Sequence, residues 1–279
     1  MTPLTRLVLV GHPVSHSLSP RFQNAALRVA GSELAYDAID VAPEALDQTM
    51  RAFVGGRVAG NVTIPHKEAV FALCDERTAI AERVGAVNTF WPDAGRLVGD
   101  NTDVGGFDAA FRRAFGPPPD KLRAVIFGAG GAAAAVLAAM ENWRGATAII
   151  VARSMPRTNA LAARFPKVAT TVAPAGPGAG AVVDEVVRNA GLIVNATPAG
   201  LADDDGPVDV ALCDPTARVF DLAYRHGGTP WVQQARARGL KAIDGLDMLV
   251  EQGALSFARW LGVEPDRTVM YRAVSDLAQ

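Results

Sequence analysis

The chain alternates short apolar runs with longer segments in which apolar residues recur every three or four positions. Such runs are typical of buried strands, and the longer periodicity is typical of amphipathic helices. Over the first hundred residues the runs predict strands at 6–10, 34–41, 58–64, 86–91 and 96–99. Helices are predicted between them at 20–30 and 43–54, from Pro65 onward, and from a Thr78 cap to residue 84. This alternation predicts an α/β block.

Residues that favour particular backbone shapes mark several of these boundaries. Ser19 is a candidate N-cap, Pro20 suits the first helical position, and Gly31 suits the end of the same helix. The sequence PDAG at 92–95 separates two strand-like runs and therefore predicts a hairpin.

The same alternation continues through the rest of the chain. Strands are predicted at 125–127, 147–151, 168–172, 192–196, 219–222 and 240–242. Helices are predicted at 103–115, 182–189, 231–238, 248–261 and 269–277, with an exposed loop at 174–180.

A proline-rich turn divides the chain. The helix at 103–115 is followed by GPPPD (116–120), which cannot continue it because proline lacks a backbone donor and fixes φ. We interpret this helix and turn as the connector between two domains. The first domain is predicted to cover residues 1–103, completed by 246–279, and the second to cover 104–245. The predicted fold class is α/β, with C-terminal helices that return to the first domain.

The second domain opens on a glycine-rich turn between a buried strand and an alanine-rich helix. Gly128, Gly130 and Ala133 match the G-x-G-x-x-G/A spacing of dinucleotide-binding units. Small residues there permit a tight turn, close approach of a pyrophosphate, and close packing of helix on strand. The helix N-terminus then offers free N–H groups to the phosphates. The alternative interpretation is an ordinary turn between strand and helix.

Composition narrows the class of protein. With 49% apolar residues, 20% charged residues and a net charge of −2, the chain gives no reason to expect nucleic acid or a membrane surface as partner. Cys74 and Cys213 are isolated, so a reducing cytoplasm is expected and neither a disulfide framework nor a metal site. We interpret the N-terminal apolar run as a strand and not as a signal peptide.

Four stretches of the first domain carry unusual polar residues: HSLSP (16–20), NVTIPHKE (61–68), AVNTF (86–90) and GDNTD (99–103). Taken singly, each has a plain explanation: Ser19 as a cap, Lys67 as a surface charge, each Asn-Thr pair as turn chemistry. In an open α/β sheet, however, ligands bind beyond the carboxyl ends of strands, where several of these stretches lie. Together they predict a polar site for a ligand with many hydroxyl groups and a small carboxylate.

These motifs, with GAGGA, NATP-G, DLAY and MLVEQ in the same order and spacing, resemble the shikimate dehydrogenase family over nearly the whole chain. The resemblance implies an N-terminal substrate domain, a Rossmann-type dinucleotide-binding domain, and C-terminal helices packed back on the substrate domain. It also implies NADP-dependent, reversible reduction of 3-dehydroshikimate to shikimate in aromatic amino-acid biosynthesis. The expected partner is this small molecule alone, for a cytoplasmic monomer or homodimer.

The resemblance implies roles for individual residues. Lys67 is the catalytic acid/base, paired with Asp103. The substrate-binding residues are Ser17 and Ser19 for the carboxylate, Thr63, Asn88 and Asp103 for the ring hydroxyls, and Tyr224 and Gln252 for the far side. A lysine ammonium suits ketone reduction, because it offers a proton and stabilises charge at oxygen as hydride reaches carbon. For Gln252 alone, a solvent-facing helix position is the alternative.

The residues after the second strand of the dinucleotide unit predict NADP and not NAD. NAD sites carry Asp or Glu at this point, whereas this chain has Arg153, Ser154 and Arg157. Two arginines and a hydroxyl suit a 2′-phosphate, although solvated surface arginines are the alternative. The other expected cofactor-binding residues are Gly128, Ala129, Gly130, Gly131 and Ala132 for the phosphates, with Thr197, Leu222 and Gly245 toward the nicotinamide.

The chain departs from the family pattern at Gln23, where relatives often have His, and at Val104, where many have Gly; His66 receives no role. The acidic run at 203–205 is interpreted as a solvated loop and not as a metal site. These departures leave the reaction class intact but leave the substrate open, so a quinate/shikimate or aminoshikimate dehydrogenase is the nearest alternative. A non-catalytic NADP-binding sensor is the alternative outside enzymes, and the presence of both Lys67 and Asp103 argues against it.

Overall fold

The computed structural model describes residues 3–171, 179–199 and 206–274. The chain divides into two compact units: unit 1 is Met1–Gly106 with Leu249–Asp276, and unit 2 is Phe107–Met248 with Leu277–Gln279. It passes between them inside helices α5 (Asp103–Phe115) and α10 (Leu246–Leu261). Each crossing lies three residues beyond the boundary that the sequence indicates.

Unit 1 contains a six-stranded mixed sheet in the order β2-β1-β3-β5-β6-β4. Its strands are β1 (Arg6–Gly11), β2 (Tyr36–Asp40), β3 (Val58–Val62), β4 (Glu76–Arg77), β5 (Thr89–Asp93) and β6 (Arg96–Asp100). Strand β1 runs parallel to β2 and β3, whereas β5 is antiparallel to β3 and β6. The predicted hairpin joins β5 to β6 through Ala94 and Gly95, both at positive φ, as a two-residue hairpin turn requires.

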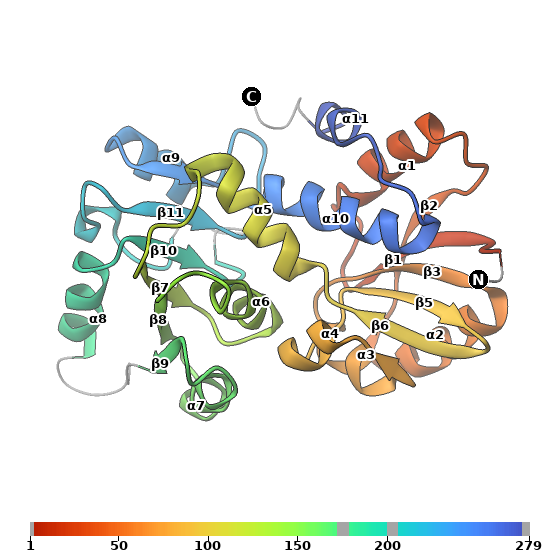
Figure 1. Cartoon of the computed structure of the whole chain (residues 1–279), viewed down its shortest axis with the longest axis horizontal. Coiled ribbons are helices and arrows are strands. Elements are labelled where there is room, and N and C mark those ends of the chain that lie inside the picture. Colours follow the sequence, from red (N-terminus) through yellow and green to blue (C-terminus); the bar gives the residue numbers. More distant parts are fainter. Residues whose placement is uncertain (1–2, 172–178, 200–205, 275–279) are drawn as a thin grey trace. The chain divides into compact units, whose positions relative to one another are not determined.

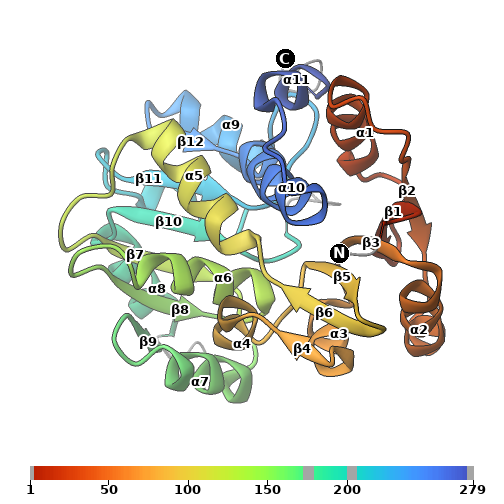
Figure 2. The same cartoon turned by 45° about the vertical axis from the view of Figure 1, so that its right-hand side comes forward.

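The helices of unit 1 are α1 (Ser19–Val29), α2 (Leu46–Gly56, preceded by a 3₁₀ turn at Pro43–Ala45), α3 (Lys67–Leu73), α4 (Ala79–Val84) and α11 (Arg267–Arg272). Helix α10 also supplies residues to this unit, and α11 lies beside α1 in both views (Figures 1 and 2). The predicted return of the C-terminal helices to the first domain is therefore confirmed.

Two predicted helix starts are wrong. Leu18, and not Ser19, is the N-cap of α1, because Ser17 Oγ already accepts the Ser19 N–H at 3.2 Å and Ser19 enters the helix. Helix α3 begins at Lys67 and not at Pro65, because the His66 N–H closes a turn onto the Thr63 carbonyl at 2.9 Å, and Pro65 lies inside that turn.

Unit 2 contains a six-stranded parallel sheet in the order β12-β11-β10-β7-β8-β9. Its strands are β7 (Arg123–Phe127), β8 (Thr147–Val151), β9 (Ala169–Thr171), β10 (Leu192–Asn195), β11 (Arg218–Asp221) and β12 (Lys241–Ile243). Counted within the unit, this is the 3-2-1-4-5-6 order of a Rossmann sheet. The order reverses between β7 and β10, so the ends of these two strands form the switch point where such sheets bind ligands.

The helices of unit 2 are α6 (Gly131–Met140), α7 (Met155–Arg164), α8 (Ala179–Arg188) and α9 (Pro230–Ala237), with a 3₁₀ turn at Val210–Leu212. Residues 133–140 of α6 are buried on every side, which explains why this helix is apolar all round and not amphipathic. A continuous aromatic cluster joins α5, with which the unit begins, to the rest of unit 2. Its members are Phe107, Phe111, Phe115, Trp143 and Phe220.

Strand β4 and helix α7 were not predicted from the sequence. Strand β4 has only two residues, too few for a periodic signal, and α7 begins within the stretch that we interpreted as a phosphate clamp, with Ser154 as its N-cap and Arg157 in its first turn. Most of the predicted loop at 174–180, the acidic run at 203–205 and the end of the predicted helix at 269–277 lie outside the described residues. Among the helices that are described, none is long and apolar enough to cross a membrane.

Candidate active site

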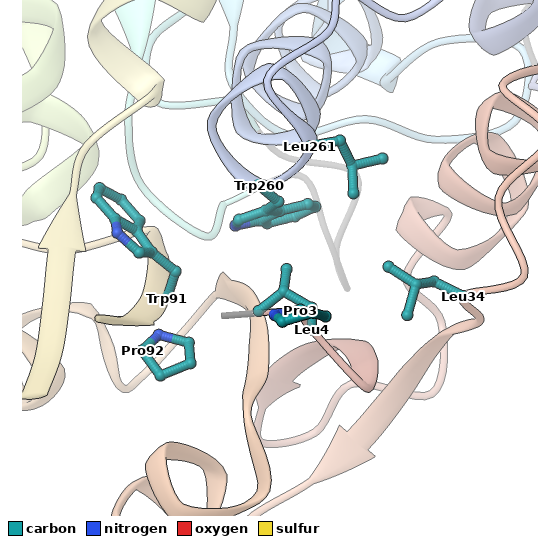
Figure 3. Close-up of a pocket in the computed structure, with 7 residues that line it drawn as sticks. All are labelled: Pro3, Leu4, Leu34, Trp91, Pro92, Trp260 and Leu261. Carbon is teal, nitrogen blue, oxygen red and sulfur yellow. The ribbon is translucent and has the colours of Figure 1, made fainter. Parts of the chain in front are cut away.

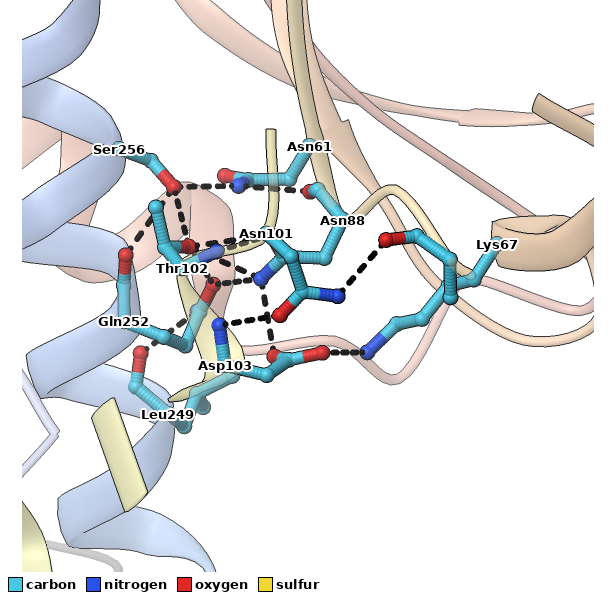
Figure 4. Close-up of polar contacts among 10 residues, drawn as sticks. Asn61, Lys67, Asn88, Asn101, Thr102, Asp103, Leu249, Gln252 and Ser256 are labelled. Atoms are coloured by element: carbon cyan, nitrogen blue, oxygen red, sulfur yellow. Dashed lines mark hydrogen bonds and ion pairs between the residues drawn. The ribbon is translucent and has the colours of Figure 1, made fainter. Parts of the chain in front are cut away.

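Lys67 and Asp103 form a half-buried ion pair in unit 1. Lys67 Nζ donates to Asp103 Oδ2 at 2.6 Å, and their side chains are 21% and 6% exposed. Lys67 is the first residue of α3, at the end of the turn after β3, and Asp103 is the first residue of α5, beyond the end of β6. Two residues 36 positions apart are thus brought together at one edge of the sheet (Figure 4).

Asn88 holds the carboxylate of this pair from the other side. Asn88 Nδ2 lies 2.9 Å from Asp103 Oδ1 and 3.1 Å from Gln252 Oε1, and Asn88 Oδ1 accepts the Thr102 N–H at 2.7 Å. Asn101 adds a further bond, because its Oδ1 accepts the Asp103 N–H at 3.1 Å. Lys67, Asp103, Asn88 and Gln252, which the sequence placed in one site, therefore lie in one hydrogen-bonded group.

A buried polar layer supports this group, and no role was predicted for its members from the sequence. Asn61 on β3 donates from Nδ2 to the Asn88 carbonyl at 3.1 Å and to Ser256 Oγ at 2.8 Å. Ser256 on α10 also lies 3.0 Å from Thr102 Oγ1, and the Tyr36 hydroxyl donates to Asn61 Oδ1 at 2.8 Å. The motifs NVTIPHKE and GDNTD contain Asn61 and Thr102, but Tyr36 and Ser256 stand in segments without a polar motif.

The serine pair is placed at the start of α1. Ser17 Oγ donates to Ser19 Oγ at 3.3 Å, and Ser19 is buried while Ser17 is half-buried. Burial raises the pKa of Tyr36 well above its usual value, against the opposing effect of a hydrogen bond with Ser19. Thr63 is half-buried beyond the end of β3. Its methyl group packs closely on Gly11, since a Cβ added to Gly11 would lie 2.4 Å from that methyl group.

Gln23, a departure from the family pattern, and His66, to which no role was assigned, both have hydrogen-bond partners in unit 1. Gln23 is buried in α1, and its Nε2 donates to the Gly253 carbonyl of α10 at 2.9 Å. His66 is also buried, with Nε2 2.6 Å from the Val41 carbonyl oxygen. Val104 is half-buried within α5, whose observed bounds match the prediction.

An apolar cavity of about 220 Å³ lies at the opposite end of the unit 1 sheet (Figure 3). Its lining residues are Pro3, Leu4, Leu34, Trp91, Pro92, Trp260 and Leu261. Pro3 and Leu4 precede β1 and Leu34 precedes β2, so the cavity adjoins the amino ends of these strands. The ion pair follows the carboxyl ends, so the cavity is separate from the candidate active site.

In unit 2, the glycine-rich turn has the geometry of a phosphate-binding loop. Gly128 has φ +117°, and a Cβ on it would lie 2.7 Å from the Ala196 carbonyl oxygen, so only glycine fits. Gly130 is the N-cap of α6, and a Cβ on it would meet no described atom within 4 Å. Ala133 is fully buried, whereas the four residues before it, Ala129, Gly130, Gly131 and Ala132, are half-buried at the helix N-terminus. The residues present thus fit a dinucleotide pyrophosphate.

Arg153, Ser154 and Arg157 are exposed at the carboxyl end of β8 and the first turn of α7. Ser154 is the N-cap of α7, but its side chain makes no capping hydrogen bond there. Its carbonyl oxygen instead accepts the Thr158 hydroxyl at 2.8 Å. Two guanidinium groups beside a helix N-terminus form an arrangement suited to a phosphate.

The other predicted cofactor residues lie beyond the ends of β10, β11 and β12. Thr197 Oγ1 donates to Asn195 Oδ1 at 2.6 Å, and the Leu222 N–H donates to the Asn195 carbonyl at 2.9 Å. Gly245 is buried, and a Cβ on it would lie 2.2 Å from the Leu222 carbonyl oxygen. Tyr224 is half-buried in the same segment as Leu222. The sequence motif NATP contains Asn195, but sequence reasoning assigned it no role.

Unit 2 has a parallel sheet whose strand order reverses beside this glycine-rich turn, and unit 1 holds a lysine–carboxylate pair. These two features define a two-domain nicotinamide-dependent dehydrogenase. The family model for the shikimate dehydrogenase substrate binding domain matches residues 9–90, and that for the shikimate 5′-dehydrogenase C-terminal domain matches residues 245–274. A shikimate dehydrogenase (NADP⁺) of Mesorhizobium japonicum is 42% identical, covering 96% of this chain and 95% of that protein. The chain belongs to the shikimate dehydrogenase family.

Solved structures agree with this assignment. The Thermus thermophilus shikimate 5-dehydrogenase in complex with NADP(H) and shikimate is 37% identical, with a TM-score of 0.85 and coverage of 98% of this chain and 99% of that chain. A quinate dehydrogenase from Corynebacterium glutamicum in complex with NAD is 28% identical, with a TM-score of 0.87 and coverage of 98% and 99%. The α/β fold class and the two-domain plan are confirmed.

Asp221 gives the first testable prediction. Burial raises its pKa to about 6, from a usual value near 3.8, although hydrogen bonds oppose the shift. Between these values the folded protein binds more protons than the unfolded chain, so the free energy of unfolding falls as the pH rises from 4 to 7. The fall attributable to Asp221 is up to about 3 kcal/mol. Urea unfolding across this range, for the parent and for Asp221→Asn, measures it by difference. A difference that does not change with pH would contradict the assignment.

Proposed function

We propose that the chain is an NADP-dependent shikimate dehydrogenase that catalyses the reversible reduction of 3-dehydroshikimate to shikimate. The observation that carries this proposal is the ion pair between Lys67 Nζ and Asp103 Oδ2, 2.6 Å long, at the carboxyl ends of the unit 1 strands. A reaction that interconverts a ketone and an alcohol needs one proton-transfer group at the oxygen, and the pair provides it.

In the direction of reduction, Lys67 donates a proton from Nζ to the carbonyl oxygen of the substrate. In the reverse direction it accepts the proton of the hydroxyl group. The positive charge of Lys67 also stabilises negative charge that develops on that oxygen. Asp103 orients the ammonium group, Asn88 binds the Asp103 carboxylate, and Asn101 accepts the backbone N–H of Asp103. The hydride would come from bound NADPH in reduction and would pass to bound NADP⁺ in oxidation.

The remaining polar residues of unit 1 fit a hydroxylated carboxylic acid. Ser17 and Ser19 hold the substrate carboxylate with their hydroxyl groups. Thr63, Asn88 and Asp103 bind the ring hydroxyls. Tyr224 and Gln252 contact the far side of the substrate.

The cofactor is held by unit 2. The turn formed by Gly128, Ala129, Gly130, Gly131 and Ala132 binds the pyrophosphate, and Arg153, Ser154 and Arg157 bind the 2′-phosphate. Thr197, Leu222 and Gly245 contact the nicotinamide end. We further infer a cytoplasmic enzyme that acts as a monomer or homodimer, since its isolated cysteines suit a reducing compartment and its near-neutral charge suits a small-molecule substrate.

A spectrophotometric assay tests the proposed reaction. The purified protein is expected to reduce NADP⁺ with shikimate, at a higher kcat/KM than with quinate or an aminoshikimate. Equal or better turnover of one of these analogues would move the chain to the alternative dehydrogenases, and no turnover of any would favour the non-catalytic sensor.

Lys67→Ala tests the acid/base role. We expect kcat to fall by about 10²–10⁴-fold, the usual contribution of general acid–base catalysis. The dissociation constant of NADPH, measured by fluorescence titration, should not change. Lys167→Ala removes an exposed lysine of unit 2 and serves as control. A rise in KM without loss of kcat would make Lys67 a binding residue instead.

Arg153→Ala tests the cofactor preference. The KM for NADP⁺ is expected to rise, by about tenfold or more for the loss of one charge-assisted phosphate contact. The KM for NAD⁺ should stay the same, because NAD⁺ has no 2′-phosphate. Arg188→Ala on α8 is the matched surface control. If the parent enzyme showed a higher kcat/KM with NAD⁺ than with NADP⁺, the assignment of this clamp would be wrong.

A further inference from the structure

Asp221 is a buried carboxylate at the last position of β11, fully shielded from solvent. Three donors point at it: Asn195 Nδ2 at 2.9 Å, the Ala223 N–H at 3.0 Å and the Thr229 hydroxyl at 2.7 Å. Within the described part of the chain, no lysine or arginine forms a salt bridge with it. Burial of a carboxylate with hydrogen bonds alone is costly, so its position calls for a compensating role.

The first of these bonds fixes the loop after β10. Asn195 Nδ2 also donates to the Ala199 carbonyl at 3.0 Å, and Asn195 Oδ1 accepts both the Thr197 N–H and the Thr197 hydroxyl. Asn195 is fully buried and cannot rotate without breaking this set. The carboxylate of Asp221 thus determines, through one amide group, where the 195–199 loop lies beside the switch point between β7 and β10.

The second bond fixes the loop after β11. The Ala223 N–H donates to Asp221, and the Ala223 carbonyl accepts the Gly245 N–H at 2.8 Å. Gly245 in turn packs on the Leu222 carbonyl with no room for a side chain. Through Ala223, the carboxylate therefore also sets the positions of Leu222 and Gly245, beyond the ends of β11 and β12.

We propose that Asp221 is a positioning residue for the nicotinamide end of the cofactor, which holds the segments bearing Thr197, Leu222 and Gly245 in one arrangement. The inference rests on the proposed function, since it takes these three residues to face the nicotinamide. It does not involve the 2′-phosphate clamp, which lies past β8 on the far side of β7 in the strand order.

The positioning role of Asp221 depends on its hydrogen bonds and not on its negative charge. Two substitutions distinguish these two contributions. In Asp221→Asn, Oδ1 can still accept from Asn195 and Ala223, while Nδ2 can donate to the Thr229 oxygen. In Asp221→Ala, all three donors lose their acceptor. Val219→Ala is the matched control, because Val219 is a fully buried residue of the same strand and belongs to the apolar core cluster of unit 2.

The test is the dissociation constant of NADPH and of NADH, from fluorescence titration, with melting temperature as the measure of folding. Asp221→Ala is expected to weaken both cofactors by the same factor, about tenfold or more, as for the loss of at least one buried hydrogen bond. Asp221→Asn should restore most of the affinity. Val219→Ala should lower the melting temperature and leave both dissociation constants unchanged.

Three results would overturn the inference: parent-like affinity in Asp221→Ala, no recovery in Asp221→Asn, or a loss of affinity in Val219→Ala equal to that in Asp221→Ala. The last would mean that loss of stability alone weakens cofactor binding. If the parent protein itself bound neither NADPH nor NADH, the proposed function would fail, and that result is distinct from these three.

Discussion

Lys67 and Asp103 each begin a helix, and their charges meet where both helices present the positive ends of their dipoles. For Asp103 this position is favourable, whereas for Lys67 the helix dipole and the ammonium charge repel each other. The lysine is therefore held against the electrostatics of its own helix by the carboxylate 2.6 Å away. The Lys67 ammonium group and the N-termini of both helices therefore lie close together at one end of the unit 1 sheet. A ketone oxygen that gains negative charge during reduction would be stabilised most strongly at such a point.

A pair of charges with so little solvent around it needs further hydrogen bonds to compensate for lost hydration. Asn88 provides one to the Asp103 carboxylate, and Asn101 holds the backbone N–H of Asp103. Asn61 and Thr102 fix Asn88 in turn, and Ser256 bonds to both of them. Residues of α10, of β3 and of the turn after β6 thus hold the Lys67–Asp103 pair in place. Unit 2 repeats the principle with other residues, since Asn195 and Asp221 bind the backbones of the loops that follow β10 and β11.

Local sequence signals were sufficient to predict most helices and strands, but not the hydrogen bonds between residues far apart in the chain. Helix α5 and strand β8 have the predicted bounds, because a proline run ends the first and a β-branched apolar run defines the second. The start of α3 was misplaced because Pro65 is usual at a first helical position but here lies in a turn. Motifs in four separate stretches of the sequence identified the members of the ion-pair site, which are Lys67, Asn88, Asp103 and Gln252. Ser256 could not be found this way, because its partner Asn61 lies 195 positions away and only tertiary packing brings them together.

The residues proposed to bind the cofactor and those proposed to bind the substrate differ in how many hydrogen bonds they share with one another. Arg153, Ser154 and Arg157 are exposed at the start of α7, outside both buried networks, so a substitution there opens no cavity in the core. Asn88, by contrast, shares its amide group among Asp103, Gln252 and Thr102, and any replacement leaves buried partners unsatisfied. Cofactor preference is therefore open to evolution by single mutations of nearly neutral stability. A change of substrate has to pass through destabilised intermediates or wait for coordinated mutations, which makes substrate choice the slower of the two properties to diverge.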